Sequence, residues 1–143
     1  MTGDEIFLID TNVLIYYYDA ADQRKHRIAK NIIDDCWNNE RNIVVSAQTL
    51  SEFFSIVTKK KFLSGKDAIR VISDIIEFDG WIKISFSHET VLDAAKISEE
   101  AGMPYWDSLL AATMKHNLVF NIYTENKKDF KTPWLNAQNP FEK

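Results

Sequence analysis

A run of four apolar residues that stops at an aspartate constrains this chain more than any other feature. Ile6, Phe7, Leu8 and Ile9 are followed directly by Asp10. An uninterrupted apolar run of this length is typical of a strand buried on both faces of a parallel sheet, with helices above and below it. Asp10 would then lie at the carboxyl end of a central strand, the edge where ligands bind in open α/β sheets. We therefore expect a candidate cation site at this point.

Short apolar runs and helical patterns alternate along the rest of the chain. Further strands are expected at 43–45, 81–86 and 118–123, and helices at 13–18, 24–39, 47–61, 67–78, 88–101 and 104–117. The segment from Thr132 onward is expected to lie extended over the core. Strands that alternate with helices indicate an α/β fold, a three-layer α/β/α sandwich around a mostly parallel central sheet.

The composition is that of an ordinary globular protein, and we expect one domain spanning residues 1–143. Cys36 is the only cysteine, which excludes an intrachain disulfide, and it falls on the apolar stripe of a helix, where packing is its expected role. Asp4 and Glu5 stand where a basic leader would be, and the apolar run after them is too short for a signal-peptide core or a membrane span. A cytoplasmic protein without a membrane partner is expected.

The net charge of −4 argues against a protein that coats nucleic acid through bulk electrostatics. Basic residues nevertheless cluster in three places: 24–30, 59–70 and 127–131. Each cluster can be a solvated surface or part of a basic rim around an acidic cleft.

Three acidic residues are candidates for a common site, and each has a structural alternative. Asp10 can cap the following helix. Glu52 completes a Thr49-x-x-Glu52 capping-box pattern, yet it also follows the second strand and so lies at the same edge as Asp10. Asp107 points the same way as a buried stripe of its helix, where a carboxylate is costly unless it is paired or favoured by the helix dipole.

Other chemistries have less support in the sequence. His26, His88 and His116 lie in unrelated elements and show no zinc-binding spacing. Haloacid-type phosphatases need a second aspartate where Asn12 stands, and no Walker glycine loop is present. The aromatic residues of 16–18, and Trp106 beside Asp107, can stack on bases, although packing is the more ordinary use.

Four motifs resemble those of the PIN-domain family in order and spacing, over nearly the whole chain. They are Leu8-Ile9-Asp10-Thr11-Asn12-Val13-Leu14, Ser46 with Leu50-Ser51-Glu52-Phe53, Trp106-Asp107-Ser108-Leu109-Leu110-Ala111-Ala112, and Tyr123-Thr124-Glu125-Asn126 with Asp129-Phe130. The size of the chain is similar to that of the single-domain VapC-type toxins of bacterial toxin–antitoxin pairs.

The resemblance implies an endoribonuclease that depends on Mg²⁺ or Mn²⁺ and hydrolyses RNA phosphodiester bonds. Asp10, Glu52 and Asp107 would be its catalytic, metal-binding acids, and Thr11, Asn12, Ser46 and Thr124 would support them. At the fourth corner many relatives carry aspartate, whereas this chain has Asn126, which can hold a metal through a water but adds no charge. Glu125 or Asp129 can substitute, and the sequence does not decide between them.

The resemblance also implies an RNA substrate, a protein antitoxin and a homodimer. Two alternatives remain open: a housekeeping PIN nuclease in RNA processing or DNA metabolism, and a catalytically inactive PIN-like module that binds nucleic acid or protein.

Overall fold

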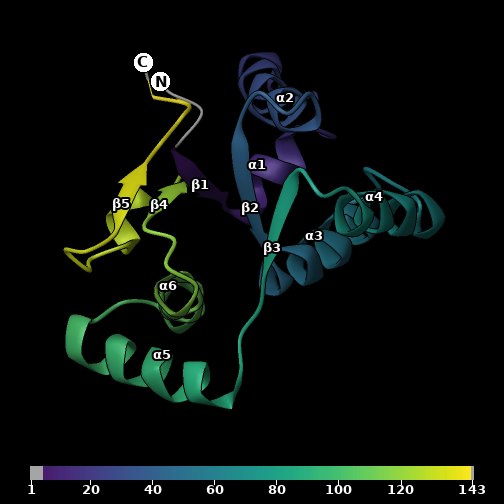
Figure 1. The fold of residues 1–143 in the computed structure, drawn as a ribbon. Coiled ribbons are helices and arrows are strands. Elements are labelled where there is room, and N and C mark those ends of the chain that lie inside the picture. Colours follow the sequence, from purple (N-terminus) through teal and green to yellow (C-terminus); the bar gives the residue numbers. More distant parts are fainter. Residues whose placement is uncertain (1–4, 143) are drawn as a thin grey trace.

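A five-stranded, all-parallel sheet forms the centre of the computed structural model, which describes residues 5–142. The strands are β1 (Ile6–Ile9), β2 (Asn42–Ser46), β3 (Trp81–Ile84), β4 (Asn121–Tyr123) and β5 (Asn136–Gln138), and their order across the sheet is β3-β2-β1-β4-β5 (Figure 1). The strand with the opening apolar run is thus central, as the sequence predicts. Because all strands are parallel, their carboxyl ends meet at one edge of the sheet.

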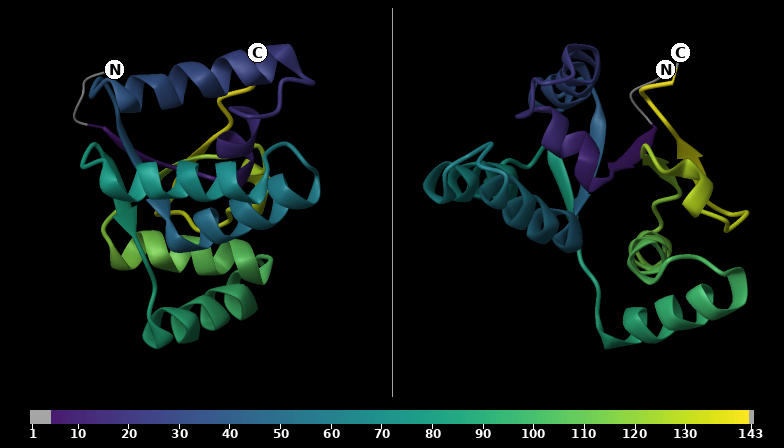
Figure 2. Two further views of the ribbon diagram at one scale, coloured as in Figure 1. Left: turned by 90° about the vertical axis from the view of Figure 1, so that its right-hand side faces the viewer. Right: turned by 180° about the vertical axis from the view of Figure 1, so that it is seen from behind.

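Helices cover both faces of the sheet, which confirms the predicted α/β/α architecture (Figures 1 and 2). One face packs against α1 (Thr11–Tyr16), α2 (Gln23–Trp37), α3 (Ala47–Lys59) and α4 (Gly65–Glu77). The other face packs against α5 (His88–Ala101) and α6 (Tyr105–His116). Alternate residues of a strand serve opposite faces: Phe7 and Ile9 join the first cluster and Leu8 joins the second.

The C-terminal region differs from the sequence prediction in two respects. The predicted strand at 118–123 is shorter, because Leu118 adopts a left-handed φ of 58° after α6 and only Asn121–Tyr123 is extended in the sheet. The segment from Thr132 is not merely laid over the core. It adds the edge strand β5, which pairs with β4 in the register Ile122↔Ala137.

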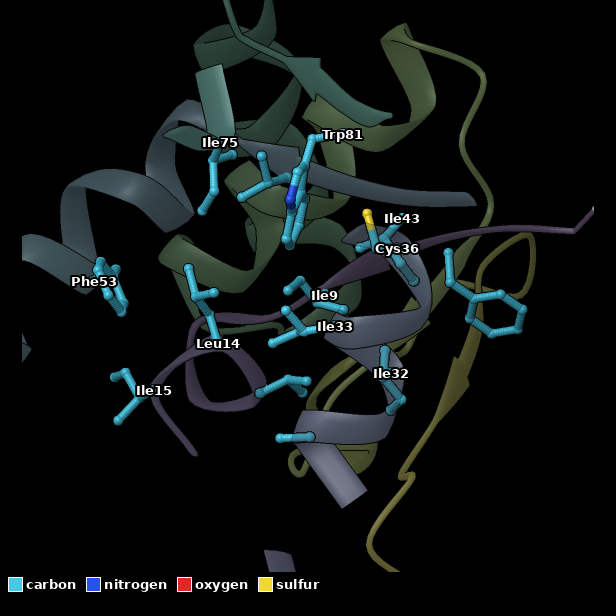
Figure 3. Packing of buried hydrophobic residues seen from close by; sticks show 14 of the residues in the cluster. Ile9, Leu14, Ile15, Ile32, Ile33, Cys36, Ile43, Phe53, Ile75 and Trp81 are labelled. Atoms are coloured by element: carbon cyan, nitrogen blue, oxygen red, sulfur yellow. The ribbon is translucent and has the colours of Figure 1, made fainter. Parts of the chain in front are cut away.

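The larger core cluster is shown in Figure 3, where Cys36 of α2 lies among Ile32, Ile33 and Ile43. Cys36 is completely buried, as predicted for a packing residue. Burial raises the pKa of its thiol to about 11, which keeps the thiol protonated and unreactive at neutral pH.

Helix ends follow ordinary capping chemistry. Ser46 and Ser64 accept hydrogen bonds from the third residues of α3 and α4, and Gly102 ends α5 with a left-handed φ of 66°.

No helix within 5–142 combines the length and apolar character needed to cross a bilayer. A short 3-10 helix, η1 (Lys127–Asp129), follows β4.

Candidate active site

Asp10 is held firmly at the carboxyl end of β1. Its backbone N–H donates to the Tyr123 carbonyl at 3.0 Å, which ties it to β4. Its Oδ1 accepts from the Thr11 N–H at 2.7 Å and its Oδ2 from the Thr124 hydroxyl at 2.8 Å. Asp10 therefore caps α1 and also bridges two strands, so the capping role does not exclude a role in a site.

Burial raises the pKa of Asp10, and the hydrogen bonds from Thr124 and Thr11 oppose that rise. The negative charges of Glu52 and Glu125 raise the pKa further.

A hydrogen bond from Thr11, the residue that follows Asp10, holds Glu52 near Asp10. The Thr11 hydroxyl donates to Glu52 Oε1 at 2.7 Å, across 41 positions of sequence. The capping-box interpretation of Glu52 is wrong, because Ser46 is the N-cap of α3 and accepts from the Thr49 N–H at 3.0 Å. Glu52 lies further along the helix, so its side chain is not used in capping and can take part in the site.

Asp107 lies in the first turn of α6, which reaches the same edge of the sheet. Its pKa is raised to about 6, first by burial and then by the charges of Asp10, Asp129 and Glu52. The three predicted acids therefore feel one another's charge, although they come from three separate elements.

These acids do not yet form a closed coordination shell. Within residues 5–142, no three His, Cys, Asp or Glu side chains are gathered closely enough to hold a metal ion as they stand. Mg²⁺ keeps several waters and is usually bound by one or two protein carboxylates, so a looser cluster of oxygen donors still suits it. The donor set, which is carboxylate and hydroxyl without His or Cys, fits a hard divalent cation.

Glu125 and Asp129, the two candidate acids for the fourth position of the site, have different partners. Glu125 is bound by Lys25 at 2.5 Å and by the Tyr16 hydroxyl at 2.9 Å, so its charge is already paired. Asp129, in η1, acts instead on Asp107. Asn126 is exposed, and its backbone N–H donates to the Thr124 hydroxyl at 3.0 Å. Asp129 is therefore the stronger candidate for the missing acid.

The supporting residues act at different distances. Thr11 and Thr124 contact the acids directly, whereas Ser46 is completely buried and acts by starting α3. Asn12 lines a cavity of about 520 Å³, together with Tyr16, Lys59 and Lys60.

Gln48 was not among the residues predicted from the sequence, yet its Nε2 donates to the Trp106 carbonyl at 3.0 Å and so joins α3 to α6. Its place one helical turn before Glu52, on the same face, was the available clue. The tyrosines are used mainly for packing and structural hydrogen bonds: Tyr17 donates to Asp34, and Tyr18 meets Phe53 edge-on.

Comparison with protein families identifies the chain. The family model described as PIN domain matches residues 7–132, and this range contains every acid of the candidate site. The chain belongs to the PIN-domain family. No curated protein matches it.

Solved structures with the same fold include several toxin–antitoxin proteins. The PIN-domain chain is 18% identical to a chain of a toxin–antitoxin complex from Klebsiella pneumoniae, with a TM-score of 0.66 and coverage of 95% of this chain and 98% of that one. It is 16% identical to VapC20 of Mycobacterium tuberculosis, described as a Sarcin-Ricin loop cleaving toxin, with a TM-score of 0.67 and coverage of 88% and 93%. VapBC2 from Rickettsia felis, bound to a promoter DNA fragment, is 20% identical, with a TM-score of 0.64 and coverage of 94% and 98%.

Proposed function

We propose that this PIN-domain protein is a metal-dependent endoribonuclease, and that it is the toxin of a VapBC-type pair. The observation that carries the proposal is that Asp10, Glu52 and Asp107 approach one edge of the sheet, where burial first, and then the charges of Asp10, Asp129 and Glu52, raise the pKa of Asp107 to about 6. Unpaired acids are costly, and a bound cation removes that cost. Acidic groups whose pKa is perturbed in this way cluster at functional sites.

Asp10, Glu52 and Asp107 would hold Mg²⁺ or Mn²⁺, with Asp129 beside Asp107 and Asn126 further out. When bound, such a cation activates water for in-line attack and offsets charge on the phosphoryl oxygens. The protein's own part is positional. Thr124 and the Thr11 N–H fix both oxygens of Asp10, and the Thr11 hydroxyl fixes Glu52. Hydrolysis at this site would leave a 5′-phosphate and a 3′-hydroxyl.

An RNA substrate is supported by two lysines at the end of α3, the helix that carries Glu52. Lys59 and Lys60 line the cavity that also contains Asn12, two positions after Asp10. A strand of RNA that crosses the acidic site can place a neighbouring phosphate on these lysines, which supply the backbone affinity that a net charge of −4 does not. Replacing both lysines with alanine should weaken RNA binding and flatten its dependence on salt.

A labelled, partly structured RNA incubated with purified protein and Mn²⁺ tests the activity. Cleavage should vanish in Asp10→Asn and Glu52→Gln, and EDTA should abolish it. Glu99→Gln, which makes the same carboxylate-to-amide change at an exposed position on α5, is the matched control and should cleave normally. Cleavage that survives Asp10→Asn would point to a contaminant, and folded protein that never cleaves would favour the inactive module.

The toxin role, the antitoxin and the homodimer rest on the resemblance and on the toxin–antitoxin complexes among the similar structures. Expression of the chain alone should arrest growth, and the product of a neighbouring small gene should relieve the arrest. Growth that continues while the purified protein cleaves RNA would favour a housekeeping nuclease. Light scattering of the purified protein measures its oligomeric state and so tests the homodimer. We also propose that the protein is cytoplasmic.

A further inference from the structure

A second cavity borders the acidic site. It has a volume of about 480 Å³ and lies between α3, α6 and the segment that joins β3 to α5. Glu52 lines this cavity and is also hydrogen-bonded to Thr11, beside Asp10. A molecule that places a phosphate at the acids can therefore extend directly into the cavity.

Two aromatic side chains wall the cavity and are unusually exposed. Trp106 is 63% exposed and Phe86 is 40% exposed, so neither is consumed by core packing. Tyr105 meets the Trp106 ring edge-on, at 73° between planes and 5.2 Å between centroids. Exposed aromatic rings of this kind are the surfaces on which unpaired bases stack in single-stranded nucleic acid.

Gln48 supplies an independent reason to expect a ligand here. Its side chain is only 9% exposed, it lines the cavity, and its Nε2 is fixed on the Trp106 carbonyl at 3.0 Å. That contact fixes the orientation of the amide and leaves Oε1 as a buried acceptor, for which no described residue supplies a donor. A buried acceptor without a donor is costly, and a ligand that brings an N–H group would satisfy it.

The combination selects one chemical class. The aromatic side chains of Trp106 and Phe86 favour a planar ring, and Gln48 Oε1 can accept a hydrogen bond from a donor on that ring. Ser51 and Glu52 add further oxygen atoms to the same lining. Adenine, cytosine and guanine carry an exocyclic amino group with two N–H donors, which can serve Gln48 Oε1 and one further oxygen of the lining, whereas uracil offers only its single N3–H donor.

We propose that this cavity is a subsite for one unpaired nucleobase that carries an exocyclic amino group, next to the phosphodiester bond that is cut. The base stacks on Trp106 and donates to Gln48, and Glu52 is the wall shared with the acidic site. The position of the base relative to the cut bond rests on the proposed nuclease function. Recognition of the base does not, because it depends on the lining of the cavity.

Titration of the protein with AMP, CMP and UMP in the presence of Mg²⁺ tests the subsite without any bond to cleave. The indole N–H signal of Trp106 in the NMR spectrum, assigned by its loss in Trp106→Phe, reports binding. AMP and CMP should shift this signal and bind about fivefold more tightly than UMP, the factor expected for one hydrogen bond. Equal affinities for the three nucleotides, or a Trp106 signal that none of them shifts, would overturn the proposal.

Variants separate stacking from base recognition. Trp106→Ala should weaken AMP binding about tenfold, since it removes one stacking surface, and Trp106→Phe should retain most of the affinity. Gln48→Leu should bring AMP and UMP to similar affinities. Phe120→Ala removes an aromatic ring that is 41% exposed before β4, at the opposite edge of the sheet, and should change nothing.

Mapping the ends of cleaved RNA distinguishes this proposal from the nuclease proposal. The wild-type protein should cut beside amino-bearing bases, and Gln48→Leu should lose the preference while still cutting. Cleavage with no base preference in either protein would overturn the subsite and leave the nuclease intact. Selective binding of AMP by a protein that never cuts RNA would support the subsite and overturn the nuclease.

Discussion

Replacing Asp107 with asparagine should stabilise the metal-free protein, and the gain should grow with pH. The side chain of Asp107 is half-buried, and its pKa is raised from 3.8 to about 6, by burial first and then by the charges of Asp10, Asp129 and Glu52. Near pH 4 the carboxyl is largely protonated in the folded protein and costs little. As the pH rises toward 6 the unfolded chain gives up the proton more readily, so the unfolded state is favoured. Above about pH 7 this cost is constant.

The structure also sets the size of the effect. The difference between 3.8 and about 6 corresponds to an upper limit of about 3 kcal/mol at neutral pH. Water screens a half-buried group, so we expect a stabilisation of about 1 kcal/mol in Asp107→Asn. The gain should largely disappear near pH 4 because asparagine and a protonated carboxyl are then similarly uncharged.

Urea unfolding in EDTA at pH 4.5 and pH 8, followed by circular dichroism, measures this difference. Glu99→Gln, at an exposed position on α5, is the control and should show no comparable change with pH. Adding Mg²⁺ at pH 8 should stabilise the wild-type protein more than Asp107→Asn, since a ligand stabilises the state that binds it. A stability difference that is independent of pH, or that falls as the pH rises, would refute the charge coupling.

Three further outcomes are expected. Thr124→Val removes the donor to Asp10 Oδ2 and should lower RNA cleavage about tenfold with little loss of fold, measured as the initial rate at saturating Mn²⁺. Cys36 should resist a thiol reagent until the protein unfolds, because its pKa is about 11, and Cys36→Ala should cost about 1 kcal/mol in urea unfolding. Gly102→Ala should lower the free energy of unfolding by about 1 kcal/mol, since Gly102 adopts a left-handed φ of 66°. Calorimetry should show a lower melting temperature, and an unchanged melting temperature would contradict this prediction.

Much of the fold is legible in local patterns. The run from Ile6 to Ile9 is apolar because the strand is buried on both faces from Phe7 to Ile9, and this pattern indicates a parallel sheet. Ser87 and Gly102 bound α5 as capping chemistry predicts. The edge strand β5 could not be predicted in this way. Its residues Asn136–Gln138 lack an apolar pattern, and they become a strand only because β4 offers them an edge.

Some features of the candidate site also follow from the local sequence, and others only from the tertiary structure. The sequence by itself determined that Asp10 ends a buried strand and that acids follow at Glu52 and Asp107, because residue type and short-range spacing are local properties. Only the tertiary structure decided which groups each acid interacts with. Thr11 reaches Glu52 across 41 positions, Lys25 pairs with Glu125, and Asp129 is left to act on Asp107. Such choices depend on distances through space and on exclusion of water, which no pattern along the chain contains.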